Sequence, residues 1–289
     1  MQNLDRGILS VYDYRKKSNS ILFFIAVIAI VGMVASMLYP ILITVFNGLK
    51  SREEVFAFPP TFVPSQWVWE NFDKGWHYID LMQFLRNTLS IFAGNLVATV
   101  LILGLAAFSL SKLQIPYRKP IYFFFLSTLF IPPTTYIIPN FVNLRDLGLL
   151  NTFWAFWLPA GASAFYLLLL KNFFDGIHNE MFEAARIDGA SEWRCFIQIA
   201  LPLSVPIFST LAIFVFSNAW NDWFWPNLVL QGDNIPLATA IYKFVINARG
   251  LPMNVRFAIL TMVMLPPIIV FLVFQKYIMR GLQLGGVKG

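Results

Sequence analysis

The chain reads EAARIDGASEWRCFIQIALP from Glu183 to Pro202. This segment is polar and rich in helix-forming residues, whereas long apolar segments lie on both sides of it. A charged helical segment between two apolar ones is a candidate docking surface for a soluble protein. It is also what an amphipathic connector resting on lipid headgroups would look like. The local pattern leaves both interpretations open.

The residues of this segment predict a helix, a bend and a second helix. The first helix should begin near residue 180, because Glu180 and Glu183 lie where acidic side chains favour the helix dipole. Gly189 supplies a permissive backbone position for the bend. The second helix should cover residues 191–200 and end at Leu201-Pro202, since proline restricts the residue before it.

Such an element offers two kinds of contact to the groove of a partner. Ala184 and Ala185 form a small-residue face. Three larger apolar side chains are expected to contact the partner as well, namely Phe182, Ile187 and Trp193.

Composition places the chain in a membrane. Hydrophobic residues make up 58% of it and charged residues only 12%, with a mean hydropathy of +0.65, whereas soluble proteins carry about 25% charged residues. A spanning helix needs about 20 apolar residues. Six segments qualify: 20–46, 87–111, 120–144, 152–173, 203–228 and 257–279. They do not alternate in polarity as barrel strands do, so the predicted class is an all-α polytopic membrane protein.

Prolines are expected to interrupt two of these spans. The third contains Pro132, Pro133 and Pro139, and the sixth contains Pro266 and Pro267. Such breaks persist in lipid only where protein or water satisfies the freed carbonyl groups. We therefore expect both spans to face the interior of a helix bundle.

The first apolar stretch follows Arg15-Lys16-Lys17 and continues to Phe46. It is longer than the apolar region of a signal peptide, so we interpret it as an uncleaved first span. With six spans, 13 of the basic residues share the side of the two termini and 8 lie on the other side. The positive-inside rule then puts both termini in the cytoplasm. The basic pI of 9.4 needs no nucleic-acid partner to explain it.

The cysteine and histidine residues indicate neither a disulfide nor a metal site. Cys195 is the single cysteine, so no intramolecular disulfide is possible. His77 and His178 fall on opposite sides of the predicted membrane, so no metal site is expected.

A candidate substrate path lies toward the outer end of the fifth span. Asp222 is the only carboxylate in the six spans, and ionisable residues at membrane depth are functional candidates. With Asn218, Trp220 and Asn221 it offers aromatic faces and amide groups, which suit the ring faces and hydroxyls of a sugar. The alternative is an interfacial aromatic belt, with Asp222 simply near water.

The chain resembles a known family at this point. Glu183-Ala184-Ala185, Gly189, Ile199 and Leu201-Pro202 match the EAA loop of ABC importer permeases at every specified position. Within that family the chain is similar to the carbohydrate-uptake branch, near the second permease subunit of maltose-type systems. Further matching pieces follow in order: Phe56-Ala57-Phe58-Pro59-Pro60, Glu70-Asn71-Phe72, Arg86-Asn87-Thr88-Leu89, Leu147-Gly148-Leu149-Leu150-Asn151-Thr152, Ile187-Asp188-Gly189-Ala190, Trp220-Asn221-Asp222 and the tail from Gly281 to Gly289.

The resemblance implies a fold and its divisions. The fold is that of a type I ABC importer permease, with six transmembrane helices and a cytoplasmic coupling helix. Residues 1–19 would be a cytoplasmic segment, 20–280 the transmembrane domain and 281–289 a cytoplasmic tail. Within the domain, the EAA coupling loop would cover about 175–202 and an external loop 229–256, which in the family probes the binding protein. A merely solvated loop is the alternative for 229–256.

The resemblance also implies partners and a role. Such a chain is not an enzyme: it works with a homologous permease, two ATP-binding cassette ATPases and an external solute-binding protein in the bacterial inner membrane. ATP and Mg would be bound by the ATPases, and the chain itself lacks a Gly-x-x-x-x-Gly-Lys-Ser/Thr loop. The cargo would be a sugar or oligosaccharide moved by alternating access, with glycerol phosphate or a polyamine as the alternative.

Two groups of residues would contact the ATPases. The coupling group is Glu183, Ala184, Ala185, Asp188, Gly189, Ile199, Leu201 and Pro202. The second group lies in the tail and comprises Gly285, Gly286 and Lys288. Other classes fit less well: an intramembrane enzyme would need a catalytic constellation inside the bundle, and a passive channel would not need the EAA segment.

Overall fold

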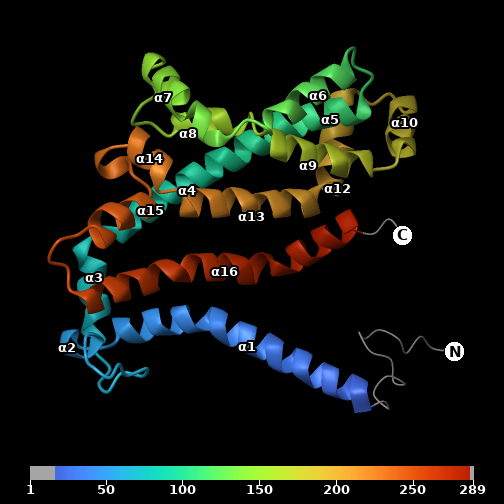
Figure 1. Cartoon of the computed structure of the whole chain (residues 1–289). Helices are drawn as coiled ribbons and strands as arrows, with labels where there is room; N and C mark the ends of the chain where they lie inside the picture. The colour runs from blue at the N-terminus through green and yellow to red at the C-terminus, as the bar shows by residue number, and fades with distance from the viewer. Residues whose placement is uncertain (1–16, 287–289) are drawn as a thin grey trace. The chain divides into compact units, whose positions relative to one another are not determined.

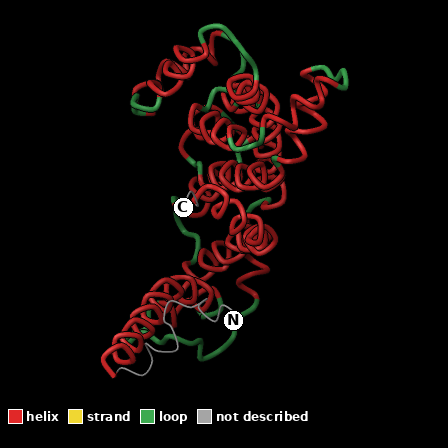
Figure 2. Tube along the Cα trace, turned by 90° about the vertical axis from the view of Figure 1, so that its right-hand side faces the viewer, coloured by secondary structure: helices red, strands yellow, loops and turns green. Residues whose placement is uncertain are grey.

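The computed structural model describes residues 17–286, with side chains for residues 19–275. In this part of the chain, helices are joined by turns and loops and no strand occurs (Figure 2). The chain divides into two compact units, which are described separately. Unit 1 comprises the residues up to His77 together with Gly250–Val263, and unit 2 comprises Tyr78–Arg249 and the residues from Met264 onward.

Unit 1 contains a long apolar helix and the segment that follows it. Its helices are α1 (Lys17–Gly48), α2 (Arg52–Val55), α3 (Glu70–Tyr78) and the first part of α16 (Met253–Gly286). The most apolar stretch of α1 is exposed on all sides, as suits a helix whose surroundings are lipid or another membrane protein.

Buried amide groups hold unit 1 together. Asn71, which is 1% exposed, donates from Nδ2 to the carbonyls of Gly48 (2.9 Å) and Lys50 (2.8 Å). Asn254 Nδ2 donates to Asn71 Oδ1 at 2.9 Å. These bonds connect the end of α1, the start of α3 and the start of α16, so the polar backbone groups at the end of α1 are satisfied inside the protein.

Unit 2 contains the remaining helices, including three short π-helical segments labelled η2, η4 and η6. Its first half comprises α4 (Leu81–Ala98), η2 (Thr99–Leu103), α5 (Gly104–Lys112), α6 (Arg118–Thr128), η3 (Pro133–Tyr136), α7 (Ile137–Asp146), α8 (Trp154–Ala160), α9 (Ala164–Asp175) and α10 (Asn179–Ile187). Its second half comprises α11 (Glu192–Cys195), η4 (Phe196–Ala200), α12 (Leu201–Leu203), α13 (Val205–Asn221), α14 (Phe224–Val229), η5 (Gly232–Asn234), α15 (Leu237–Ala240) and η6 (Ile241–Ile246).

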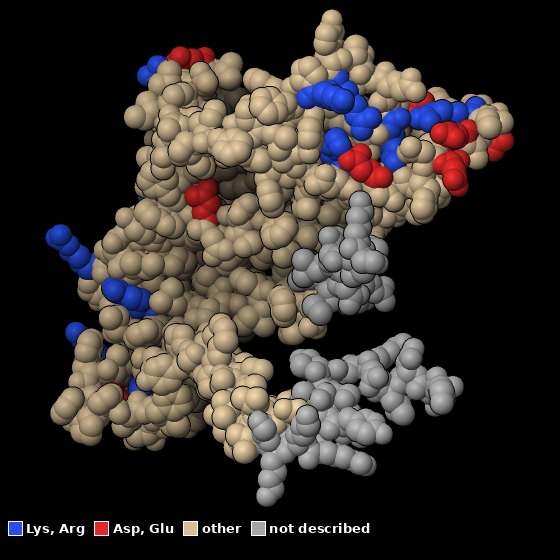
Figure 3. All heavy atoms as spheres, turned by 45° about the vertical axis from the view of Figure 1, so that its right-hand side comes forward, with Lys and Arg blue, Asp and Glu red and all other residues tan. Residues whose placement is uncertain are grey.

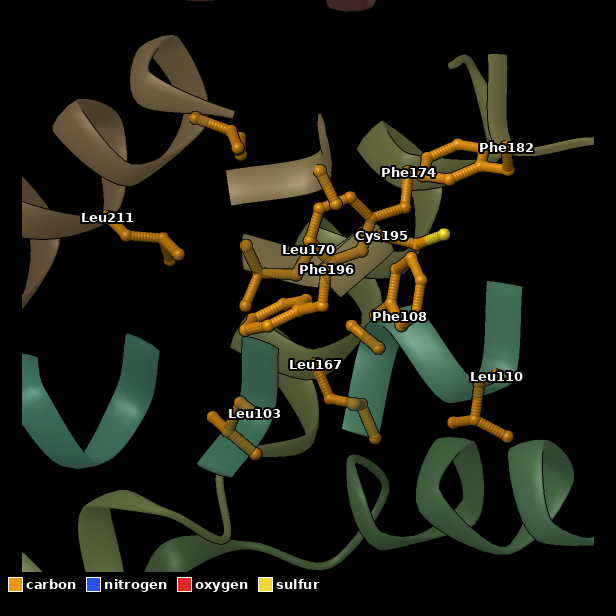
Figure 4. Close-up of a cluster of buried hydrophobic side chains, with 13 residues drawn as sticks. Leu103, Phe108, Leu110, Leu167, Leu170, Phe174, Phe182, Cys195, Phe196 and Leu211 are labelled. Atoms are coloured by element: carbon orange, nitrogen blue, oxygen red, sulfur yellow. The ribbon is translucent and has the colours of Figure 1, made fainter. Parts of the chain in front are cut away.

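The main hydrophobic core of unit 2 lies where α5 packs on α9 (Figure 1). Phe108 is at its centre and makes edge or tilted ring contacts with Phe174, Phe182 and Phe196, at centroid distances of 6.2, 5.8 and 5.4 Å. These side chains come from four different elements and converge in one cluster (Figure 4). Close packing of these rings, with their edge-to-face contacts, holds the four elements together.

The structure supplies a helix or helix pair for each of the six expected spans. Among the described residues, three helices are long and apolar enough to cross a membrane: α1, α4 continued through α5, and α16. Three bent pairs would make up the rest if each is one span. Their bends are 92° between α6 and the η3–α7 segment, 43° between α8 and α9, and 74° at Ser204, before α13.

The expected interruption is therefore found in the third span and not in the sixth, whereas the expected interior position is not found for the third span, since α6 and η3 contain no buried residue. Helix α16 continues through Pro266 and Pro267, as helices in a membrane can where neighbouring groups or local adjustments satisfy the freed carbonyls. The fourth and fifth spans are bent although neither was expected to be. Ser163 caps α9 by accepting from the Tyr166 N–H, and Ser204 donates to the Ala200 carbonyl, so local serine bonds mark both bends.

The predicted end of the second helix at Leu201-Pro202 is also wrong. Helix α12 continues to Leu203. Pro202 lies in its first turn, where an N–H is not needed by the helix, and the wider turn of η4 precedes it.

Candidate coupling surface and substrate cavity

Helix α10 is anchored by one buried aromatic residue. Phe182 is 1% exposed and packs against Phe108 in the core cluster (Figure 4). The expectation that Phe182 contacts a partner is therefore wrong, because the ring is already buried within this chain. A helix as short as α10 has little stability of its own in water, so Phe182 supplies the packing that holds it in place.

The other side of α10 is free of the core. Glu183 and Ala184 are exposed, and Ile187 is 86% exposed. Trp193 in α11 is 58% exposed. Ala185 is half-buried and packs against the core cluster, so the two alanines do not share one outward face. The outward-facing residues are thus Glu183, Ala184, Ile187 and Trp193, which we call the coupling surface.

The bend after α10 has the geometry of a Schellman motif. Gly189 has a φ of +81°, and its N–H donates to the Arg186 carbonyl at 3.0 Å. The Ala190 N–H donates to the Ala185 carbonyl at 2.9 Å. Both are the bonds that close a helix whose last residue turns left-handed, a conformation that glycine adopts without a steric penalty. Asp188 is the exposed residue just before this turn.

An ion pair closes the bend on its outer side. Arg186 donates to Glu192 from Nε (2.7 Å) and from Nη2 (3.0 Å), a two-point contact between α10 and α11. The hydrogen bonds to Glu192 raise the pKa of Arg186 above its ordinary value. Arg186 Nη2 also donates to the Lys112 carbonyl at 3.4 Å, which connects the bend to the end of α5.

Lys112 ties the start of α10 to α5. Its Nζ donates to the Ile177 carbonyl (2.6 Å) and to Asn179 Oδ1 (2.8 Å), and it lies 5.4 Å from the centre of the Phe182 ring. Charged side chains gather at this end of unit 2, around α6 and α10 (Figure 3). Both ends of α10 are thus fixed to α5 by polar contacts while its middle is fixed by Phe182.

The other residues predicted to contact the ATPases differ in how far they are exposed. Ile199 in η4 and Leu201 in α12 are half-buried and pack against the core cluster, whereas Pro202 is exposed. Gly285 and Gly286 are the last residues of α16. Lys288 lies outside the described residues.

Three of the four predicted substrate residues line one cavity. It has a volume of about 400 Å³ and is lined by Ile91, Asn95, Phe156, Asn218, Ala219, Asn221, Asp222, Pro226 and Pro236. Asn218 and Asp222 are four residues apart at the end of α13, so they face the same side. Trp220 does not line this cavity. It stacks on Phe216 at 5.3 Å and lines a different, smaller cavity with Asn221 and Pro267.

Asp222 also has a local structural role. Its Oδ1 accepts from the Trp225 N–H at 3.1 Å, at the start of α14. Asn218 Nδ2 donates to the Tyr166 hydroxyl at 2.8 Å, and Asn221 Nδ2 donates to the Ser217 carbonyl at 2.7 Å. The polar end of α13 is therefore held in a defined arrangement before any ligand binds.

Sequence reasoning missed the residues that other helices bring to the cavity. Asn95 comes from α4 and Phe156 from α8. Asn95 is a polar residue in the middle of an apolar span, which is a signal for the interior of a bundle. Nothing in the sequence pairs Phe156 with the end of α13.

The predicted external loop 229–256 is largely folded. Leu230, Ile235, Leu237 and Ala240 are buried, and Asn87 Nδ2 donates to the Ile235 carbonyl at 2.9 Å. This segment packs back on α4 through α15. Only shorter stretches of it are exposed, such as η5 at Gly232 and the residues around Gly250.

Long apolar helices and bent helix pairs define a polytopic membrane protein, and its short charged helix α10 has one exposed side. Residues 98–283 match the model of the family described as "binding-protein-dependent transport system inner membrane component", and the chain belongs to this family. It is a permease subunit of an ABC importer, which is a transport subunit.

Relatives and a solved structure agree with this assignment. The chain is 32% identical over 253 residues to YurM of Bacillus subtilis, described as a probable ABC transporter permease, covering 87% of this chain and 84% of the relative. It is 29% identical over 271 residues to the sn-glycerol-3-phosphate permease UgpE of Yersinia pestis, covering 90% and 95%. It is 28% identical over 258 residues to the diacetylchitobiose uptake permease NgcG of Streptomyces coelicolor, covering 86% and 83%.

A solved structure has a backbone very similar to that of this chain, although the two sequences are only distantly similar. A chain in the crystal structure of a bacterial ABC transporter involved in the import of the acidic polysaccharide alginate aligns with a TM-score of 0.83 at 26% identity. The alignment covers 91% of this chain and 98% of that one. The fold is thus that of an ABC importer permease along nearly the whole chain.

Proposed function

We propose that this permease moves a sugar or oligosaccharide into the cytoplasm, driven by two ATPase subunits, one of which docks on the coupling surface. The observation that carries the proposal is the two-sided construction of α10: Phe182 is buried in the core while Glu183, Ala184 and Ile187 are exposed. A helix fixed on one side and free on the other can transmit a partner's movement to α5 and α9. Coupling further requires that the surface make different contacts in two states of the ATPase.

The full set of partners follows from membership of the family. We propose a homologous permease, two ATPases that bind ATP and Mg, and an external solute-binding protein, with the coupling group from Glu183 to Pro202 and the tail residues Gly285, Gly286 and Lys288 at the ATPases. In this arrangement both termini, including residues 1–19 and 281–289, are cytoplasmic. The exposed parts of residues 229–256 would face the binding protein. The excess of basic residues on the side of the termini supports this orientation.

Two observations favour a sugar as cargo. Relatives include a diacetylchitobiose permease, and the structural match belongs to an alginate importer. The cavity at the end of α13 is lined by three amide side chains and an aromatic ring, the groups that bind hydroxyls and sugar ring faces. Glycerol phosphate is the second candidate, because UgpE is a similar relative.

Uptake into membrane vesicles tests the proposal. The permease is expressed with the transporter subunits encoded beside it, and labelled diacetylchitobiose, alginate oligosaccharides and sn-glycerol 3-phosphate are offered with ATP. We expect uptake of a saccharide that stops when the ATPase is made catalytically inactive. Uptake that continues without ATP hydrolysis would identify a passive channel, and uptake of glycerol phosphate alone would establish the alternative cargo.

A further inference from the structure

A loop of unit 1 folds back along the end of α1. It follows α2 and covers residues 56–67, and we call it the return loop. Its Phe62 ring stacks on Tyr39 with 5.8 Å between the ring centroids and meets the Phe46 ring edge-on at 5.2 Å. Tyr39 lies before the end of α1 at Gly48, by about 13 Å along the helix axis. The return loop therefore lies beside the last turns of α1 and does not extend away from them (Figure 1).

The burial of α1 changes close to the residue that Phe62 contacts. Residues 20–42 are exposed, residues 43–47 are half-buried and residues 48–50 are buried. The last charged residue before this exposed stretch is Lys17. About 20 residues cross the hydrocarbon core, so a span that begins at residue 20 ends near Tyr39. A tyrosine at this place is at the headgroup level, where its ring is favoured, and Phe62 stacks on it there.

The sequence of the return loop suits contact with lipid. Residues 55–69 contain no charged residue, whereas α2 just before them exposes Arg52 and Glu53. Three prolines reduce the number of main-chain N–H groups that need a partner, namely Pro59, Pro60 and Pro64. The charged side of this region is thus the one at the far end of α1, and the uncharged side is the one next to Tyr39.

Three apolar side chains of the return loop are exposed. They are Phe56, Phe58 and Val63, and Phe58 is 96% exposed. Packing within unit 1 does not account for a phenyl ring that is almost wholly exposed. A group of exposed apolar side chains on a folded segment marks a contact with a membrane or with another protein.

Polar bonds hold the return loop in place. The buried Lys50 donates from Nζ to the Thr61 carbonyl and to Asn47 Oδ1. Glu54 Oε1 accepts from the Ser65 N–H at 2.8 Å and from Thr61 Oγ1 at 3.0 Å. The loop is thus ordered by bonds within its own unit, so contact with a further surface costs little conformational entropy.

We propose that the return loop is an interfacial anchor that rests on phospholipid headgroups, with Phe56, Phe58 and Val63 among the upper parts of the acyl chains. Water and lipid ester oxygens at this depth can accept from main-chain N–H groups of the loop, which the hydrocarbon core cannot do. The absence of charge favours lipid over a soluble partner as the occupant. The inference rests on the proposed function only for the leaflet, which the proposed topology makes the outer one.

The depth of the return loop can be measured with a nitroxide label at Phe58→Cys. The complete transporter is placed in vesicles of phosphatidylethanolamine and phosphatidylglycerol, and collision of the label with oxygen and with a water-soluble nickel complex is compared. Cys195 is the single native cysteine and is buried, so the transporter with the unsubstituted permease serves as the blank. Phe58 packs against little, so its substitution should leave the fold intact.

We expect the label at Phe58→Cys to lie about 5–10 Å below the lipid phosphates, the depth of the apolar side of an interfacial segment. Arg52→Cys is the matched control, an exposed site in α2 whose label should lie in water. Val31→Cys, an exposed site in the middle of the first span, is the deep reference. A label at Phe58→Cys that meets the nickel complex as freely as the one at Arg52→Cys would overturn the proposal. A label that meets neither oxygen nor nickel would also overturn it, because a protein would then cover the loop.

Photochemical cross-linking identifies the occupant without a nitroxide. The photoreactive p-benzoylphenylalanine replaces Phe58 in one permease and Arg52 in the control, and the vesicles contain a phospholipid with an alkyne on its acyl chain. We expect a lipid adduct of the permease from position 58 and little or none from position 52. An adduct of position 58 with the companion permease or with the binding protein, in place of the lipid, would contradict the proposal.

Both measurements are made without cargo or ATP. They report depth from the nearer membrane surface, so a reversed topology would change the leaflet and leave the depth of Phe58 as it is. A failure of the proposed function has a different sign: uptake that continues without ATP hydrolysis, or uptake of glycerol phosphate alone, in vesicles of the unsubstituted transporter.

Discussion

At the scale of single residues, Gly189 and Phe182 stabilise helix α10 in different ways. Gly189 allows the left-handed turn that closes α10, and an added Cβ would meet no atom within 4 Å. Glycine is therefore needed at this position for its backbone conformation, and not because a larger side chain would clash. Phe182 has the opposite character, since its backbone is ordinary helix and its buried ring fills the core.

Substituting Gly189 separates conformation from volume. Valine is β-branched and strongly disfavoured at positive φ, so Gly189→Val should cost about 1–3 kcal/mol locally and displace α11. We expect less ATPase to copurify and substrate-stimulated ATP hydrolysis to fall. Gly189→Asn is the control, because asparagine tolerates the left-handed region; it should retain most of both. Unchanged assembly and hydrolysis in Gly189→Val would contradict a role for the bend.

Truncating Phe182 should destabilise unit 2. Phe182→Ala leaves a cavity beside Phe108, which typically costs about 3–5 kcal/mol. Ile187→Ala on the exposed side of the same helix should change the free energy of unfolding by about 0.5 kcal/mol or less. Unfolding in detergent, followed by tryptophan fluorescence, measures both variants. Equal losses would mean that Ile187 is also packed, against the exposure seen here.

At the scale of elements, α4 and α8 pack closely against each other at Gly94. A Cβ on Gly94 would come within 2.1 Å of Trp157 Nε1, and Trp157 Nε1 donates to the Ser90 carbonyl at 3.1 Å. The absent side chain at Gly94 lets the indole lie against α4. Trp157 in turn sits next to Phe156, which lines the cavity.

The α4–α8 contact predicts a contrast between two helical glycines. Gly94→Ala should force Trp157 away from α4 and lower the unfolding free energy by about 1–3 kcal/mol. Gly32→Ala in α1 should be neutral or stabilising by up to about 1 kcal/mol, since its Cβ would meet nothing within 4 Å. Thermal unfolding of the two purified variants provides the comparison. A loss of similar size for Gly32→Ala would show that α1 is tightly packed at this position.

Sequence reasoning succeeded for elements whose signals are local. The apolar length of each span and the start of α10 near residue 180 are properties of one continuous segment. The bends at Gly161 to Ser163 and at Ser204 were not predicted, although Pro159 precedes the first and Pro202 and Pro206 flank the second. The direction of Phe182 also could not be read locally, since it depends on Phe108 from another helix.

The residues of the candidate cavity could likewise be predicted only where they are close in sequence. Asn218 and Asp222 were predicted together because they are one turn apart on α13. Trp220 was wrongly grouped with them, although its position two residues away puts it on a different side of the helix. Asn95 and Phe156 come from helices far away in sequence, and only the tertiary fold brings them to the same cavity.

At the scale of the whole molecule, the orientation of the chain is open to direct measurement. A green fluorescent protein fused after Gly289 should fluoresce in intact cells, because both termini are proposed to be cytoplasmic. Alkaline phosphatase inserted in the exposed turn at Gly232 should be active, since this turn is proposed to be external. An active phosphatase at the C-terminus would reverse the topology and would remove the coupling surface from the side where ATP is available.

The division of α10 into a buried and an exposed side has a consequence for evolution and for engineering. Changes at Glu183, Ala184 and Ile187 alter what the helix presents without repacking the core around Phe182. The exposed residues can therefore be exchanged while the packed residues beneath them are retained. A permease of this kind could be adapted to a different ATPase by exchanging a few exposed side chains. Transplanting the whole of α10 would also require the buried Phe182 ring to be packed against the core.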